Sequence, residues 1–169
     1  VNYSHTYTDT LAARNLIIGA QIIPGAIRDF GGLISNFRIV KGTRLYTSDF
    51  TPPTEALTSG IGTVLLCCNT TDNPASESTG KTITLSDPAP TASTDAPSLT
   101  SASSGESTST IKSVKFRQPI TGGRWIRVPD SDDFTLTGAF TIETWLKPAG
   151  TVQAASKTYT TIASKWTPA

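Results

Sequence analysis

The sequence predicts an all-β protein, an antiparallel sandwich or jelly roll built from short strands. Apolar and polar residues alternate with period two in several short runs, as in strands that bury one face. Glycine and proline turn signals, such as Gly122-Gly123, Pro129 and Pro148, bound these runs. No stretch keeps the 3.6-residue period of a helix for more than a turn or two. Short strands at turn-punctuated intervals are typical of β-sandwiches.

Five runs are expected to form the main strands, and a sixth run is a shorter candidate. They are residues 15–19, 33–40, 111–116, 124–128 and 140–146, with 81–85 as the short candidate. In the second run, period two places Leu33, Phe37 and Ile39 on one face and Asn36 and Arg38 on the other.

The same alternation predicts which side chains form the core. The expected core residues are Phe37, Ile39, Val114, Phe116, Ile126, Val128, Phe140, Ile142 and Leu146. The residues expected to point outward or to an interface are Asn36, Arg38, Lys115 and Arg127. A register slip of one residue would exchange the two sets.

Composition and charge exclude several classes of protein. The chain has 169 residues, enough for one ordinary domain or two small ones, and 14 Lys+Arg against 13 Asp+Glu leave a net charge of +1. This balance excludes a strongly basic nucleic-acid clamp. No apolar run approaches the ~20 residues of a membrane helix, so no membrane insertion is expected. Because the chain lacks Met and begins with Val1, we expect a processed chain or a piece of a longer one.

Residues 69–110 differ from the sequence on either side. Nothing between Thr51 and Lys115 is aromatic, and residues 69–110 are rich in Thr, Ser, Pro, Ala and Gly. Such a segment buries too little apolar area to offset the entropy of ordering it. We therefore expect an extended surface linker that contains one short strand at most.

Two long motifs carry a family resemblance. Residues 140–148 (Phe-Thr-Ile-Glu-Thr-Trp-Leu-Lys-Pro), preceded by 128–134 (Val-Pro-Asp-Ser-Asp-Asp-Phe), resemble the opening of a laminin-G-like domain of the concanavalin A-like jelly-roll class. Residues 32–53, followed by 64–68, resemble the closing part of the same domain. The closing motif is similar to tandem modules in virion proteins of tailed phages, especially marine ones. The resemblance implies a closing half at 1–68, the linker at 69–110 and an opening half at 111–169.

The order of the halves departs from the family, because the closing half comes first. A Trp-His strand and a Leu-Tyr-x-Asp-Gly hairpin, which follow the opening half in the family, are not found between the halves. Two explanations compete. The chain is either a segment of a tandem array, with the end of one module and the start of the next, or a circularly permuted single module. The tandem-array segment is preferred, because the missing strands would leave a permuted sandwich with unpaired edges. It predicts that residues 11–66 and 111–166 lie in different sandwiches.

Residues for catalysis are sparse, and no enzyme is expected. His5 is the sole imidazole and lies in a polar segment, where a surface or edge histidine is the favoured interpretation. Glu143 stands alone on its expected strand, while Glu55, Glu77 and Glu106 lie in loop-like sequence. A glycosidase pair of carboxylates cannot be assembled from them.

The two adjacent cysteines, Cys67 and Cys68, are expected to be buried free thiols. On a strand, adjacent side chains point to opposite faces, so a disulfide between them would be strained. Free thiols suit assembly in a reducing cytoplasm. Zinc is excluded, because spaced Cys and His ligands are lacking.

Two groups of residues are candidate binding sites. Asp130, Asp132 and Asp133 place three carboxylates in four positions, which suits a calcium loop, although an ordinary turn is the favoured interpretation. The resemblance adds weight to calcium, because such jelly rolls often carry a structural calcium ion. Trp125 and Arg127 share the face opposite Ile126 and Val128, and form a candidate carbohydrate or protein contact. For all three tryptophans, including Trp145 and Trp166, a core or interface role is favoured.

Two functions from different classes fit these observations. The first is a structural and adhesive module of a virion, in a fibre, decoration or tail protein, assembled in the host cytoplasm. Its partners would be other virion proteins, copies of itself and host-surface glycans. The alternative is a non-catalytic carbohydrate-binding module of a secreted glycan-active enzyme. The flanking sequence discriminates between them: further laminin-G-like repeats favour the first and a catalytic domain the second.

Overall fold

The prediction of an all-β protein is confirmed. The computed structural model describes residues 14–53, 55–70, 72–95, 112–116, 123–149 and 160–165. Within these ranges every regular element is a β-strand except one short 3₁₀ turn, η1 (Asp132–Phe134), and all strand pairs are antiparallel. No helix in this part of the chain is both long and apolar enough to cross a membrane.

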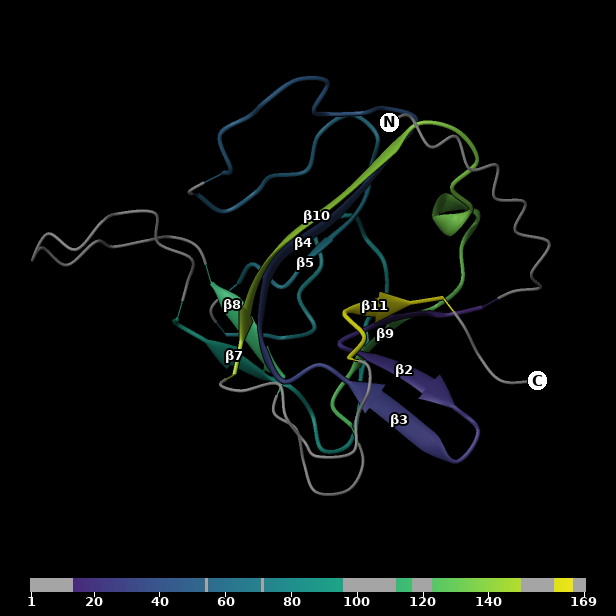
Figure 1. Cartoon of the computed structure of the whole chain (residues 1–169), viewed down its shortest axis with the longest axis vertical. Helices are drawn as coiled ribbons and strands as arrows, with labels where there is room; N and C mark the ends of the chain where they lie inside the picture. Colours follow the sequence, from purple (N-terminus) through teal and green to yellow (C-terminus); the bar gives the residue numbers. More distant parts are fainter. Residues whose placement is uncertain are drawn as a thin grey trace, which may run out of the picture.

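The larger of two main sheets is built around one long central strand, β4 (Gly32–Lys41). β10 (Phe140–Pro148) pairs with one edge of β4 along its length. The other edge of β4 is shared by β8 (Ser113–Phe116) and β5 (Thr63–Cys67), and β7 (Thr91–Ser93) extends the sheet beyond β8. In Figure 1, β10 lies in front of β4 and β5.

The second main sheet has four short strands in the order β11-β1-β9-β6. Their bounds are β11 (Ala163–Ser164), β1 (Leu16–Ile18), β9 (Ile126–Val128) and β6 (Thr84–Leu85). A separate hairpin joins β2 (Ala20–Ile23) to β3 (Ala26–Asp29) through Pro24 and Gly25. Gly25 has a φ of 73°, a conformation that glycine adopts without strain.

Side chains from both main sheets form one hydrophobic core. Leu16, Ile18, Ile126 and Val128 come from the second sheet, and Ile34, Phe37, Ile39, Leu65, Val114 and Phe116 come from the first. Six of the nine predicted core residues are therefore confirmed as buried: Phe37, Ile39, Val114, Phe116, Ile126 and Val128. The core packs tightly against the backbone at Gly19, where an added Cβ would lie 2.4 Å from the ring of Phe116.

The expectation of two separate sandwiches is wrong. β4 and β10 come from the segments compared to the closing and opening halves, and they are hydrogen-bonded neighbours in one sheet, with Ile39 opposite Ile142. The second sheet likewise joins Leu16 to Val128 and Ile17 to Ser164. Neither segment therefore completes either of the two main sheets by itself within the described residues.

The described part of the expected linker, residues 69–70 and 72–95, also takes part in both sheets. The short strand expected at 81–85 is present as β6, which pairs with β9. β7 was not predicted, and it pairs with β8. Glu77 forms a β-bridge with Cys67 at the end of β5. These residues are not a free surface connector, because their backbone hydrogen bonds add the edge strands of both sheets. Residues 96–110 lie outside the described ranges.

A bulge in β4 changes the predicted faces of that strand. Arg38 pairs with Glu143 and Ser35 with Trp145, so two β4 residues oppose the single residue Thr144. The backbone accommodates the extra residue of the bulge at Asn36, which has a φ of 53°. Ile34 is consequently buried where Leu33 was expected, and Leu33 is only half-buried.

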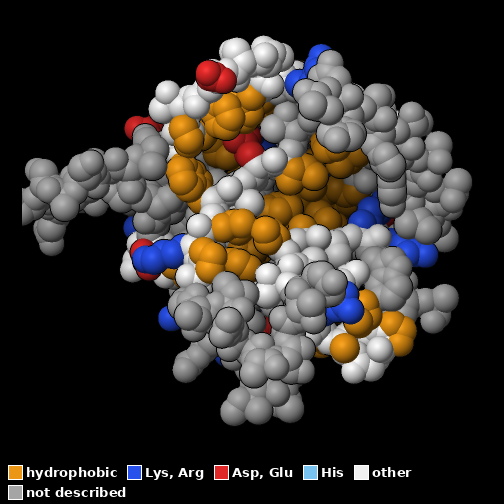
Figure 2. Space-filling model, viewed as in Figure 1, with side chains coloured by type: hydrophobic (Ala, Val, Ile, Leu, Met, Phe, Trp, Pro, Cys, Tyr) orange, Lys and Arg blue, Asp and Glu red, His pale blue; other side chains and the backbone are white. Residues whose placement is uncertain are grey.

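The expected burial of three β10 residues is also wrong. Phe140, Ile142 and Leu146 remain 43%, 49% and 37% exposed. Their alternation is as predicted, since Ile142 lies opposite buried Ile39 and Leu146 opposite buried Ile34. They are exposed because β10 is the outermost strand of its sheet among the described residues. In the view of Figure 2, hydrophobic side chains gather across the centre of the visible face of the molecule.

Candidate functional site

The candidate site lies on the face of β4 and β10 that points away from the core, and its centre is an ion pair between Arg38 and Glu143. Ile39 of β4 lies in the core, so the preceding Arg38 faces the other way, and Glu143 of β10 lies directly opposite Arg38. Arg38 Nε donates to Glu143 Oε1 at 2.6 Å, and a second guanidinium nitrogen, Nη2, contacts the same oxygen. Both side chains are only 14% exposed, so this pair is far more shielded than an ordinary surface salt bridge.

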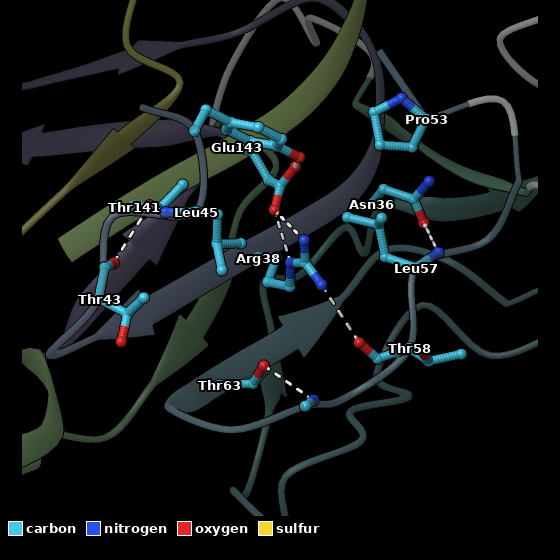
Figure 3. A network of polar contacts seen from close by, with 12 residues as sticks. Asn36, Arg38, Thr43, Leu45, Pro53, Leu57, Thr58, Thr63, Thr141 and Glu143 are labelled. Carbon is cyan, nitrogen blue, oxygen red and sulfur yellow. Dashed lines mark hydrogen bonds and ion pairs between the residues drawn. The ribbon is translucent and has the colours of Figure 1, made fainter. Parts of the chain in front are cut away.

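The loop after β4 crosses this face and is held to it by polar contacts (Figure 3). Tyr46 Oη donates to Glu143 Oε2 at 2.6 Å, and Arg38 Nη1 donates to the carbonyl of Thr58 at 3.3 Å. Thr141 Oγ1 accepts from the backbone N–H of Leu45 at 3.0 Å. Burial, followed by the hydrogen bond to the Glu143 carboxylate, raises the pKa of Tyr46. The phenol therefore stays a donor at neutral pH.

Asn36 anchors the second part of the same loop. Its Nδ2 donates to the carbonyl of Glu55 at 3.1 Å, and its Oδ1 accepts from the backbone N–H of Leu57 at 3.1 Å. Asn36 was expected to point outward, but it is fully buried. The amide satisfies two backbone groups that the loop would otherwise leave unpaired.

A groove of about 390 Å³ lies between this loop and β10. Its walls include Phe50, Pro52, Pro53, Ile142 and Trp145, and Glu143 contributes to its floor. Trp145 Nε1 donates to the carbonyl of Pro53 at 3.1 Å, which fixes the indole in place. The ring of Phe50 stacks on Tyr46 with centroids 3.8 Å apart and an angle of 18° between the planes, and Phe50 is 53% exposed. The groove thus presents immobilised aromatic surface to solvent.

The predicted contact pair, Trp125 and Arg127, lies elsewhere, on the second sheet. Ile126 and Val128 face the core, and the Arg127 guanidinium lies 5.7 Å from the centroid of the Trp125 ring. The structure therefore brings the two side chains together, as their alternation implied. Both are half-buried, and the guanidinium occupies one side of the indole.

The three aspartates proposed for calcium do not converge. Ser131 caps η1 by accepting from the backbone N–H of Asp133 at 3.2 Å. Asp133 pairs with Lys81 at 2.6 Å and Asp130 with Lys165 at 3.3 Å, while Asp132 contributes a backbone carbonyl to Lys41. The hydrogen bond from Lys81 lowers the pKa of Asp133.

Within the described residues no three Cys, His, Asp or Glu side chains are grouped as metal ligands. The contacts of the Asp130–Asp133 turn thus give the calcium hypothesis no support. His5 and Glu106, considered above for catalysis, lie outside the described ranges.

Cys67 and Cys68 are buried free thiols, as predicted, but they do not point to opposite faces. Their Sγ atoms lie 3.8 Å apart within the core. The reason is the left-handed backbone of Cys68, with a φ of 62°, which ends the strand alternation after Cys67. The hydrogen bond with Cys68, together with burial, raises the pKa of the Cys67 thiol well above its usual range.

Sequence reasoning missed the residues that form the groove. Arg38 was expected to face outward and Glu143 was noted as isolated, but their pairing depends on strands 105 residues apart. One local signal was present: Tyr46 and Phe50 stand close together before Pro52-Pro53, in a stretch without strand alternation. Aromatic residues in a loop are candidates for binding, because loops carry many recognition residues.

No family model matches the chain, and neither a curated protein nor a solved structure matches it. The case for a function therefore rests on these residues and their geometry.

Proposed function

We propose that the chain is a structural and adhesive module of a virion fibre, decoration or tail protein, and that it binds host-surface glycans in the groove beside Trp145. In this proposal the two sheets form a laminin-G-like jelly roll in circularly permuted order. The resemblance of residues 32–68 and 128–148 to that family supports the proposal, and so does the pairing of β4 with β10. A fold resemblance alone does not establish function, so the groove carries the argument.

The single observation that carries the proposal is the aromatic surface of the groove. Sugar rings present flat C–H faces that pack on aromatic rings, while nearby polar groups orient their hydroxyls. Phe50 is half-exposed and supported from behind by Tyr46, and Trp145 is held by Pro53. Because these rings are immobilised before any ligand arrives, little conformational entropy is lost on binding.

The carboxylate in the groove favours binding over hydrolysis. Both oxygens of Glu143 are engaged by cationic or hydroxyl donors, Arg38 and Tyr46. A glycosidase needs a second carboxyl group at about 5–9.5 Å, one of the two acting as an acid. Among the described residues that line the groove, Glu143 is the sole carboxylate. The arrangement supports a non-catalytic role.

A glycan array with the whole chain tests this proposal, with Phe50→Ala as the diagnostic variant. Phe50→Ala should weaken binding at least tenfold, about 1.4 kcal/mol, because it removes the exposed stacking surface. Ile61→Ala is the matched control: Ile61 is 98% exposed and does not line the groove, so this variant should bind like the wild type.

Two outcomes would contradict the groove as the glycan site. If Trp125→Ala abolishes binding and Phe50→Ala does not, the site lies on the second sheet instead. If the wild-type chain binds no glycan, the adhesive part of the proposal is wrong and a structural role remains.

A further inference from the structure

A second cavity, of about 600 Å³, lies at the other end of β10 and shares no lining residue with the groove. Its apolar walls are Phe30, Leu33, Phe116, Leu146, Pro148 and Ile162. Leu146 and Ile162 are among the exposed large apolar residues of the chain, so this cavity accounts for part of the apolar surface left open beside β10. Its volume is typical of small-molecule sites, which are mostly apolar with a few polar groups.

Two lysines flank the apolar wall. Leu33 of β4 lies opposite Lys115 of β8 on one side and opposite Lys147 of β10 on the other. Directly opposed residues on adjacent strands share a face, so the three side chains form one row across the sheet. Neighbouring strands lie about 4.8 Å apart, which places the two lysine backbones roughly 10 Å from each other. Both lysines line the cavity.

The charges at this cavity do not cancel. Asp95 is the one carboxylate among its described lining residues, and it pairs with Lys147 at 2.7 Å. Lys115 is exposed and has no ion-pair partner among the described residues. The Asp95–Lys147 pair is solvent-exposed and contributes little, so Lys147 can turn to another anion at small cost. One positive charge therefore remains beside an apolar wall.

We infer that this cavity binds a small amphipathic anion, a carboxylate with an apolar body. The body would pack against the half-buried Leu33, which shares a face with the two lysines, and the carboxylate would lie at the Lys115 ammonium. A neutral apolar molecule would leave the unpaired charge without a partner, and an amine would be repelled by it. This site is separate from the proposed glycan groove and does not depend on it.

The experiment is an NMR titration of the whole chain with octanoate, compared with 1-octanol and octylamine at equal concentrations. Octanoate should shift the amide signals of Leu33, Phe116 and Leu146 and should bind at least threefold more tightly than 1-octanol. Raising the salt concentration should weaken the binding of octanoate but not of 1-octanol, because a solvent-exposed charge contact is screened. Octylamine should bind more weakly than either.

Lys115→Gln separates charge recognition from apolar packing. It should reduce the affinity for octanoate to that for 1-octanol, whereas Lys112→Gln, three positions away and outside the cavity lining, should leave it unchanged. Equal affinities of the wild type for octanoate and 1-octanol, or an unaltered octanoate affinity in Lys115→Gln, would overturn the inference. So would the absence of shifts at the lining residues. Phe50→Ala should bind octanoate like the wild type, so failure here is distinguishable from failure of the glycan proposal.

Discussion

Asn36 donates its backbone N–H to the carbonyl of Cys68 at 3.2 Å, and these two residues have left-handed backbones, with φ of 53° and 62°. Both stand where a strand departs from regular pairing: Asn36 within the bulge of β4, and Cys68 directly after β5. Asparagine is one of the few side chains that tolerate this conformation. The contact therefore fixes where β4 and β5 part, and it places the Asn36 amide to hold the loop over the groove.

Replacing Asn36 should separate its backbone role from its side-chain role. Asn36→Gly keeps the left-handed conformation but loses the bonds to Glu55 and Leu57, and should cost about 2 kcal/mol for two hydrogen bonds. Asn36→Ala loses the same bonds and adds roughly 1 kcal/mol of backbone strain. Urea unfolding measures both values. Equal losses in the two variants would show that the backbone conformation is not the constraint.

The Arg38–Glu143 pair should contribute more to the free energy of unfolding than the exposed pair of Lys147 and Asp95 does. Glu143→Gln leaves a shielded guanidinium without its counter-charge, and should lower the free energy of unfolding by roughly 2–3 kcal/mol. Asp95→Asn, at the exposed pair, should cost under about 1 kcal/mol. The comparison uses urea titrations at neutral pH. A loss for Glu143→Gln no larger than that for Asp95→Asn would contradict the prediction.

Two phenylalanines on neighbouring strands should respond differently to truncation. Phe37 is 1% exposed, so Phe37→Ala should cost roughly 3–5 kcal/mol. Phe140→Ala should cost less than about half of that, because the side chain already contacts water on one side. Thermal and urea unfolding give both values. Equal losses would indicate that something covers the inner face of β10 in solution.

Glu77 should make stability depend on pH in acid. Burial alone would raise its pKa, but the Thr79 hydroxyl and the backbone N–H groups of Lys81, Leu66 and Thr79 donate to the carboxylate and lower it. The Glu77 carboxyl therefore binds its proton less tightly in the folded chain than in the unfolded chain, where its pKa is near 4.5. Its stabilisation is present above that pH and is lost as the pH falls through the lower folded-state value.

Glu77→Gln tests this dependence. Between neutral pH and pH 3, the free energy of unfolding should fall less steeply in the variant than in the wild type. Glu55→Gln controls for the loss of one carboxylate, since Glu55 is exposed and its side chain forms no hydrogen bond within the described residues. Parallel curves for wild type and Glu77→Gln would contradict the assignment.

The two thiols should be unreactive in the folded chain. Cys67 and Cys68 are buried, and the raised pKa of Cys67 disfavours the nucleophilic thiolate. Labelling with a disulfide reagent should therefore proceed at the rate of unfolding and accelerate with urea. Fast labelling of both thiols without denaturant would show that the core opens locally around β5.

The strands that the sequence could predict are those with clear alternation. The runs around Ile17, Ile39, Val114, Ile126 and Ile142 all form strands, because burial of one face imposes period two. The β2–β3 hairpin was missed, although Pro24-Gly25 is a turn signal. Very short strands such as β7 and β11 have too few residues for a period to be visible.

The candidate site was harder to predict than the strands. Alternation assigned Arg38 to the outer face, but nothing local indicates that Glu143 would lie beside it. The bulge at Asn36 was also invisible, because a single left-handed residue changes the faces of a strand without changing its composition. Pairing between distant strands depends on the whole chain, and a single sequence does not reveal it.

The position of β4 in its sheet also affects events during synthesis. Gly32 pairs with Pro148, so β4 leaves the ribosome roughly 100 residues before β10 does. At about 5–20 residues per second, the interval is on the order of 5–20 seconds. During that time Ile34 and Ile39 lack their neighbours on β10, and the nascent chain exposes a strand suited to pairing with other nascent chains. The sheet around β4 therefore cannot be completed until β10 has emerged, and the yield of folded chain should depend on chaperones and on expression rate.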